Sequence, residues 1–85
     1  MAYTIRFTAR ALSDLTALDR MAQVRVRQHI DRLAGNPFPP GAKKLHCEEP
    51  FFRIRAGDYR IIYRVEGQEL LVIIVKIGHR KDVYR

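Results

Sequence analysis

The segment of residues 51–64 constrains the fold most, because two alternating, strand-like runs in it flank a central Gly57-Asp58 pair. Such a pair predicts a two-residue β-hairpin loop that places Arg55 directly opposite Arg60. Because side chains alternate along a strand, the hairpin gathers its arginines on one face. These arginines are Arg53, Arg55, Arg60 and Arg64. Like charges across a ladder destabilise it, so the cluster predicts an anionic ligand, and a phosphate backbone suits several guanidinium groups.

The composition favours the same kind of partner. The chain has 85 residues, which predicts a single domain over residues 1–85. Its 16 Lys and Arg outnumber its 9 Asp and Glu, and the formal net charge is +7. This excess favours a polyanionic partner, either nucleic acid or an acidic protein.

Cysteine usage and hydropathy bear on the cellular compartment. The lone Cys47 has no second cysteine to pair with and no metal-ligand spacing around it, so we expect a structural role for Cys47 and for His46. No apolar run approaches the ~20 residues of a membrane span, and the first residues lack an apolar signal region. These features predict a cytoplasmic protein.

The N-terminal part of the chain predicts a strand and then a helix. Polar and apolar residues alternate over residues 3–7, as in a strand. Thr8 is the predicted N-cap of a helix that begins at Ala9. The apolar side of this helix is expected to hold Ala11, Leu12 and Leu15.

A second helix is predicted over residues 20–33, with Asp19 as its N-cap and the Gly35-Asn36-Pro37 break after it. Its predicted apolar face consists of Met21, Val24, Ile30 and Leu33. A basic stripe with i, i+4, i+7 spacing runs along it, formed by Arg25, His29 and Arg32. We expect the two helices to pack as an antiparallel hairpin.

The rest of the chain predicts β structure. The first hairpin is followed by a Gly67-Gln68 turn and an apolar strand over residues 70–77, a register that places Tyr63 opposite Val72. The face toward the helices is expected to hold Phe52, Ile54, Ile61, Tyr63, Val72 and Ile74. The arginines would share the other face with Ile62, Ile73 and Val75, and we expect the tail that follows to emerge beside them.

This order of elements predicts an α+β fold. An N-terminal strand and a two-helix hairpin precede a three-stranded antiparallel meander, which gives one mostly antiparallel four-stranded sheet. The helices can cover only one face of such a sheet, so the face with the arginines is the predicted partner face.

Several arginines around one phosphate offer a metal-free route to RNA cleavage. The ribose 2′-hydroxyl would attack the adjacent phosphate, and preorganised guanidinium groups would stabilise the charge that grows on the phosphoryl oxygens. The candidates for that role are Arg53, Arg55, Arg60 and Arg80. Proton transfer would fall to His79 or Tyr84, as acid or base. Alternatively, Tyr84 packs its ring on the sheet and His79 makes a structural hydrogen bond.

Three segments resemble the RelE branch of the RelE/ParE toxins of type II toxin–antitoxin modules. They are residues 3–7, residues 53–63 with the motif R-x-G-D-Y-R-x-x-Y, and residues 77–85 with the motif G-H-R-x-x-V-Y. The resemblance implies a fold like that of microbial ribonucleases and an mRNA interferase that cuts messenger RNA in the ribosomal A site. It also implies a cognate RelB-like antitoxin, acidic in part, and no metal or organic cofactor.

Roles follow from this resemblance position by position. Arg60 matches the arginine that contacts the scissile phosphate, Arg80 matches a second phosphate-stabilising arginine, and Tyr84 matches a tyrosine that stacks on a base or transfers a proton. Further RNA contacts are expected from Arg25, Arg32, Lys43, Lys44, Arg64, Lys81 and Arg85.

The chain departs from the family pattern at Arg53 and Arg55, where the best-studied relatives carry catalytic lysines. Arginine keeps its proton, so these two residues are poor general bases. Two alternatives therefore stay open. One is a catalytically weak RNA- or ribosome-binding relative. The other is a ParE-like toxin that inhibits DNA gyrase by binding, although that branch generally lacks a tail with His79-Arg80 and Tyr84.

Overall fold

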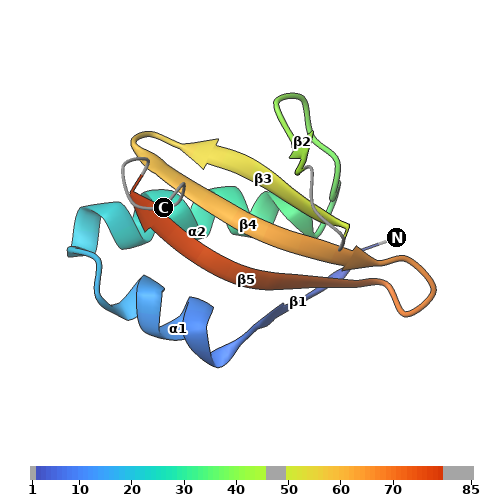
Figure 1. Ribbon diagram of the computed structural model, residues 1–85, viewed down its shortest axis with the longest axis horizontal. Coiled ribbons are helices and arrows are strands. Elements are labelled where there is room, and N and C mark those ends of the chain that lie inside the picture. The colour runs from blue at the N-terminus through green and yellow to red at the C-terminus, as the bar shows by residue number, and fades with distance from the viewer. Residues whose placement is uncertain (1, 46–49, 80–85) are drawn as a thin grey trace.

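The computed structural model describes residues 2–45 and 50–79, which form two helices against one face of a five-stranded sheet (Figure 1). The elements follow in the order β1 (Thr4–Phe7), α1 (Ala9–Thr16), α2 (Arg20–Leu33), β2 (Lys43–Lys44), β3 (Phe51–Ala56), β4 (Tyr59–Glu66) and β5 (Leu71–His79). The predicted α+β class is confirmed. The predicted strand count is wrong by one, because the short β2 adds a fifth strand.

The strand order in the sheet is β1-β5-β4-β3-β2. β1 runs parallel to β5, and the other neighbouring strands are antiparallel. β2 reaches only the first half of β3, where Lys43 pairs with Arg53 and Lys44 with Phe52. The second half of β3 therefore forms an edge of the described sheet.

Both helices begin at the predicted caps. Thr8 Oγ1 accepts the backbone N–H of Ala11 at 3.1 Å, and Asp19 Oδ1 accepts that of Ala22 at 2.8 Å. These oxygens satisfy donors that the first helical turn leaves without intrahelical partners. The predicted bounds of the second helix, residues 20–33, agree with α2. Neither helix of the described ranges is long and apolar enough to cross a membrane.

One hydrophobic cluster joins both helices to the sheet. Its buried members are Ala11, Leu15, Val26, Ile30, Leu33, Ile54, Ala56, Ile61, Tyr63, Val72, Ile74 and Ile77. Because residues of α1 and α2 enter the same cluster, the two helices cover the same face of the sheet. Figure 1 looks onto the opposite face, with α2 behind the strands. The predicted core residues of the strands are confirmed, with Phe52 partly buried against the cluster.

The predicted apolar faces of the helices are partly wrong. Met21 is 82% exposed, and Leu12 and Val24 are also exposed, whereas Val26 is fully buried. A helix turns by about 100° per residue, so positions 24 and 26 lie on nearly opposite sides of α2. Apolar residues occur on both sides of this helix, and the sheet covers the side of Val26, Ile30 and Leu33.

The predicted register between β4 and β5 is also wrong. The connection spans residues 67–70 rather than two residues, and it includes Leu70 at a φ of 55°. Tyr63 therefore pairs with Ile74 instead of Val72. A shift of two positions keeps the same side chains on the same face, which is why the core prediction survives.

A β-bulge interrupts β5 at Val75. Ile62 pairs with Lys76 and Tyr63 with Ile74, so Val75 is the extra residue in the described ladder. An extra residue reverses the alternation of the strand beyond it. Ile77 consequently points into the core, where it is 3% exposed.

Helix α1 holds the outer edge of this bulge, because β1 ends at Phe7. Thr8 Oγ1 donates to the carbonyl oxygen of Val75 at 3.0 Å. The backbone N–H of Ile77 donates to Asp14 Oδ2 at 3.1 Å. On the side of β1, β5 has no strand partner beyond Ile74 in the described sheet, and the side chains of Thr8, the N-cap of α1, and Asp14 bind its backbone there instead.

The loop after α2 is fastened to the sheet by Tyr63. Its hydroxyl donates to the carbonyl oxygen of Pro37 at 2.7 Å in a buried position. Burial raises the pKa of Tyr63 to about 12. Phe52 stacks on the Tyr63 ring with centroids 5.9 Å apart, and Phe38 meets Phe52 edge-on at 5.2 Å.

Candidate functional site

The β3–β4 hairpin has the predicted two-residue loop, and Arg55 stands opposite Arg60. Gly57 takes a φ of 64°, whereas Asp58 has no positive φ, as in a type II′ turn. The pair that flanks such a loop is hydrogen-bonded, so Arg55 and Arg60 form the next, non-hydrogen-bonded pair. In pairs of that kind the Cα atoms approach to about 4.5 Å. The sequence therefore places two arginine residues at the closest pairing position that a ladder offers.

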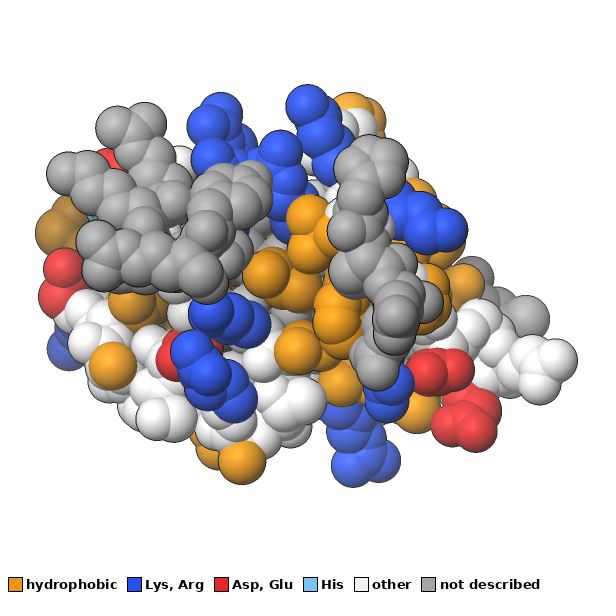
Figure 2. Space-filling model, in the orientation of Figure 1, with side chains coloured by type: hydrophobic (Ala, Val, Ile, Leu, Met, Phe, Trp, Pro, Cys, Tyr) orange, Lys and Arg blue, Asp and Glu red, His pale blue; other side chains and the backbone are white. Residues whose placement is uncertain are grey.

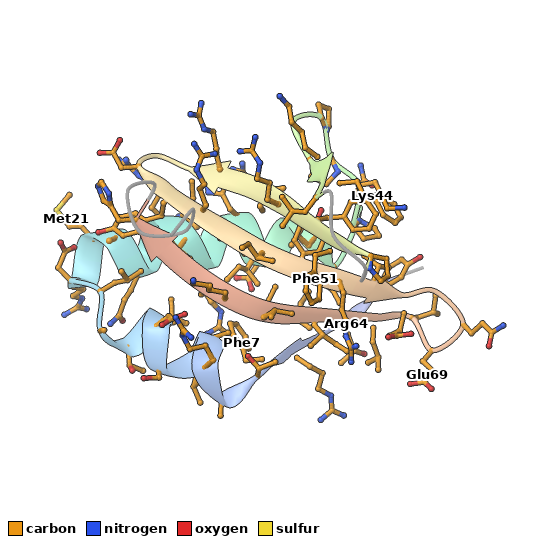
Figure 3. All side chains as sticks on the ribbon, viewed as in Figure 1. Phe7, Met21, Lys44, Phe51, Arg64 and Glu69 are labelled. Atoms are coloured by element: carbon orange, nitrogen blue, oxygen red, sulfur yellow. The ribbon has the colours of Figure 1, made fainter. Side chains whose placement is uncertain are left out.

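We call the sheet face away from the helices the arginine face. The strand registers assign to it Thr4, Arg6, Lys43, Phe51, Arg53, Arg55, Arg60, Ile62, Arg64, Glu66, Leu71, Ile73, Lys76 and Gly78. Figure 2 shows Lys and Arg side chains along its β3 side, around an apolar centre over β4 and β5. In Figure 3, Phe51 lies over the middle of this face and Arg64 lies toward the β4–β5 turn. The four arginines of the hairpin share one face, as predicted.

Arg60 is the buried charged residue of the described chain, at 8% exposure. Arg55 is exposed and Arg53 is half-buried. On the β5 side, Arg60 faces Gly78, which has no side chain to fill the space beside it. A guanidinium group keeps its charge even in such surroundings, and its attraction for an anion is stronger where water is excluded. The arrangement suits electrostatic stabilisation of a phosphate.

Arg64 lies apart from this group, four residues along β4 from Arg60. It forms an ion pair with Glu66, with 3.7 Å between Arg64 Nε and Glu66 Oε1. Both side chains are nearly half exposed, so the pair contributes at most about 1 kcal/mol and leaves Arg64 able to reach a phosphate.

His79 is not brought to the arginine face, contrary to expectation. It pairs with Tyr59, and the two rings meet edge-on with centroids 5.7 Å apart. Tyr59 packs against the core, so His79 points toward the helix side of the sheet. The cause is the bulge at Val75, because without it the alternation of β5 would place residue 79 on the arginine face.

The other residues predicted to contact RNA lie partly on the arginine face and partly on the helix side of the sheet. Lys43 lies on the arginine face, whereas Lys44 points to the opposite side. Arg25 and Arg32 belong to α2, and the Arg25 side chain reaches the hairpin turn, since a Cβ at position 57 would come within 3.0 Å of Arg25 Nη1. Several predicted residues lie outside the described ranges: His46, Cys47, Arg80, Lys81, Tyr84 and Arg85.

Sequence reasoning missed Lys76. It faces Ile62 and joins the arginine face only because the bulge shifts the register by one. A lone lysine in an otherwise apolar strand is the signal that could have drawn attention to it. Within the described ranges, no group of three or more His, Cys, Asp or Glu residues lies close enough to hold a metal ion.

The same α+β fold occurs in chains of solved toxin–antitoxin complexes. The chain belongs to the ParE toxin family of type II toxin–antitoxin systems (parDE), which it matches over residues 5–84. It is a RelE-like toxin of that family, as predicted from the sequence, because its curated relatives carry RelE-type names.

Two relatives match this chain over nearly their whole length. The toxin RelG of Mycobacterium tuberculosis is 34% identical over 86 residues, which is 100% of this chain and 99% of the relative. The putative toxin RelE1 of Methanocaldococcus jannaschii is 28% identical over 88 residues, which is 100% of this chain and 98% of the relative.

Solved structures agree with this assignment. The toxin–antitoxin complex RelBE2 of Mycobacterium tuberculosis contains a chain with a TM-score of 0.83 and 32% identity, covering 94% of this chain and 100% of that one. The archaeal RelE–RelB complex of Pyrococcus horikoshii contains a chain with a TM-score of 0.82 and 26% identity, covering 98% of this chain and 100% of that one.

Proposed function

We propose that the protein is a ribosome-dependent endoribonuclease that cleaves messenger RNA in the A site and thereby stops translation. The observation that carries this proposal is the pairing of exposed Arg55 with buried Arg60 beside Gly78. Two permanently cationic residues that stand opposite each other on a ladder favour an anionic ligand at this position. A phosphodiester passing over the arginine face supplies such an anion.

In the proposed reaction the 2′-oxygen of the ribose attacks the neighbouring phosphorus atom and the bond to the 5′-oxygen breaks. Arg55 and Arg60 stabilise the charge on the phosphoryl oxygens, with Arg53 and Arg80 as further donors. The 2′-hydroxyl proton must leave and the 5′-oxygen must gain one. Since the His79 ring meets Tyr59, we assign proton transfer to Tyr84, with groups of the ribosome positioning the RNA.

The proposed inhibitor is a cognate antitoxin that carries acidic segments. The net charge of +7 favours an acidic protein partner. The similar chains from Mycobacterium tuberculosis and Pyrococcus horikoshii occur in complexes with RelB-type proteins. Covering the arginine face would block the phosphate site.

Primer extension on a defined message with purified ribosomes tests the cleavage. We expect discrete cuts with the wild-type protein and at least a ~100-fold slower reaction with Arg55→Gln, because one preorganised donor is lost. Arg60→Gln should have the same effect, but Arg60 is buried, so its thermal unfolding must be measured alongside. Arg20→Gln removes the same charge from the exposed start of α2 and should cut normally. Intact messages with the wild-type protein would contradict the proposal.

The second candidate function is inhibition of DNA gyrase by binding. The description of the matching family, which names ParE and parDE, favours this alternative. A supercoiling assay with purified gyrase separates the two functions. Loss of supercoiling together with uncut messages would establish gyrase as the target.

A further inference from the structure

A hollow of about 430 Å³ lies beside the arginine face, at the edge of β3 that β2 leaves uncovered. Its lining residues come from α2, from the loop after it and from β3: His29, Arg32, Pro39, Pro40, Gly41, Ile54 and Arg55. Sites for small ligands span roughly 300–1,000 Å³, so this space can hold a nucleotide-sized group. Arg55 links the hollow to the arginine face.

The backbone of β3 adds a donor to this hollow. The carbonyl oxygen of Phe51 accepts from the N–H of Leu45 on the β2 side of the strand. Backbone groups of alternate residues point the same way, so the N–H of Arg55 also points toward that edge. β2 ends its pairing at Arg53, and the Arg55 amide therefore faces the hollow without a strand partner in the described sheet.

His29 contributes a group of the opposite kind. Its Nδ1 lies 2.9 Å from the carbonyl oxygen of Arg25. A carbonyl can only accept, so Nδ1 carries a proton toward it, and Nε2 is the ring nitrogen left to accept a hydrogen bond. The hollow thus combines cationic donors from Arg32 and Arg55, a backbone donor and one imidazole acceptor, with Pro39 and Pro40 as an apolar wall.

We propose that this hollow binds one nucleotide unit of single-stranded RNA, adjacent to the phosphate that the arginine face holds. The phosphate interacts with Arg32 and Arg55, the 2′-hydroxyl donates to His29 Nε2, and the sugar lies against the prolines. The carboxylate side chains of an acidic peptide would use the guanidinium groups but bring no donor of their own to the imidazole, whereas one ribonucleotide carries both the phosphate and the hydroxyl donor. This inference deepens the proposed function, since it adds a second anchoring point for the same RNA.

Binding of a fluorescein-labelled RNA decamer to the purified full-length protein tests the inference by anisotropy, without ribosomes. We expect Arg32→Gln to weaken binding about tenfold at 50 mM salt and to reduce the slope of log K against log salt by about 0.7, as for one lost phosphate contact. The matched variant Arg20→Gln should change neither quantity appreciably. His29→Phe should reduce the preference for RNA over DNA of the same sequence.

Three outcomes would overturn the inference. The first is equal binding by Arg32→Gln and Arg20→Gln. In the second, AMP binds as tightly as the decamer, which would indicate a site for free nucleotides. In the third, hexaglutamate but not RNA shifts the amide resonances of His29, Arg32 and Arg55, which would indicate a protein partner.

The two proposals fail independently. If messages stay intact on ribosomes with the wild-type protein while Arg32→Gln still weakens binding of the RNA decamer, the RNA site in the hollow is supported and the proposed cleavage is refuted. If cleavage depends on Arg55 while Arg32→Gln binds RNA normally, the hollow is refuted and the proposed function stands.

Discussion

At the scale of single residues, Tyr63 makes the folded state sensitive to alkaline pH. Its ring is fully buried and its hydroxyl donates to Pro37, so ionisation would place a charge in the core and remove a donor. Burial raises its pKa from 10.0 to about 12. The neutral form is therefore favoured by folding. The resulting stabilisation is fully present below pH 10 and is lost as the pH rises from 10 toward 12.

We expect the free energy of unfolding of the wild-type protein to fall by about 2–3 kcal/mol more than that of Tyr63→Phe over this range, since each pKa unit corresponds to about 1.4 kcal/mol. At neutral pH the variant should be about 1 kcal/mol less stable, because Pro37 loses its hydrogen bond. Urea titrations at several pH values measure both effects. Parallel pH profiles of the two proteins would contradict the prediction.

A second residue-scale prediction concerns Arg55, which is exposed and opposes Arg60. Replacing it with Gln removes a like charge opposite Arg60 on the ladder, so the variant should gain up to about 1 kcal/mol of stability while it loses the proposed cleavage. Urea unfolding at low salt measures the gain, and Arg20→Gln is the control for the change in net charge. A less stable Arg55→Gln would show that Arg55 serves the fold rather than a ligand.

At the scale of elements, α2 offers two valines in opposite environments. Val26 is fully buried and Val24 is 51% exposed. Val26→Ala should lower the free energy of unfolding by about 2 kcal/mol through lost burial and a cavity. Val24→Ala should change it by less than about 0.5 kcal/mol. Thermal or urea unfolding compares the two variants, and equal effects would show that α2 is rotated from the described position.

The bulge in β5 depends on α1 through Asp14. Asp14→Ala leaves the partly buried N–H of Ile77 without its acceptor and should cost about 1–3 kcal/mol. Asp14→Asn keeps a side-chain oxygen at this position and should cost less. Hydrogen exchange at the Ile77 amide provides a direct measurement, since it should accelerate most in the alanine variant. Unchanged exchange in both variants would show that Asp14 does not hold the bulge.

Sequence patterns predicted the parts of this fold that depend on local chemistry. The caps at Thr8 and Asp19 and the Gly57-Asp58 loop act within a few residues, and all three were predicted correctly. The bulge at Val75 was not predictable, because α1 and the end of β1 create the need for it. Val24 was misplaced because only the sheet determines which apolar side of α2 is covered.

In the candidate site, too, some features follow from local chemistry and others depend on distant parts of the chain. The opposition of Arg55 and Arg60 follows from the turn residues alone. The position of His79 depends on the bulge, so the sequence pattern placed it on the wrong face. The hollow near His29 lies between α2 and the part of the β3 edge that no described strand covers, and neither segment has a sequence pattern that predicts its contact with the other.

At the scale of the whole molecule, the net charge of +7 governs encounters with partners. Association with an acidic antitoxin should accelerate as the salt concentration falls, with little change in the dissociation rate. Stopped-flow mixing of the toxin with its separately purified antitoxin measures both rates. Association rates that do not depend on salt would contradict the acidic character of the antitoxin.

The parallel pairing of β1 with β5 has a consequence during synthesis. Thr4 finds its partner only when Leu71 has been made, and the ladder that seats Gly78 beside Arg60 closes later still. Contacts so distant along the chain form late and slowly. During synthesis, most of the chain has therefore been translated before the arginine face is complete, and the proposed RNA-binding surface forms only when translation of the protein is nearly finished.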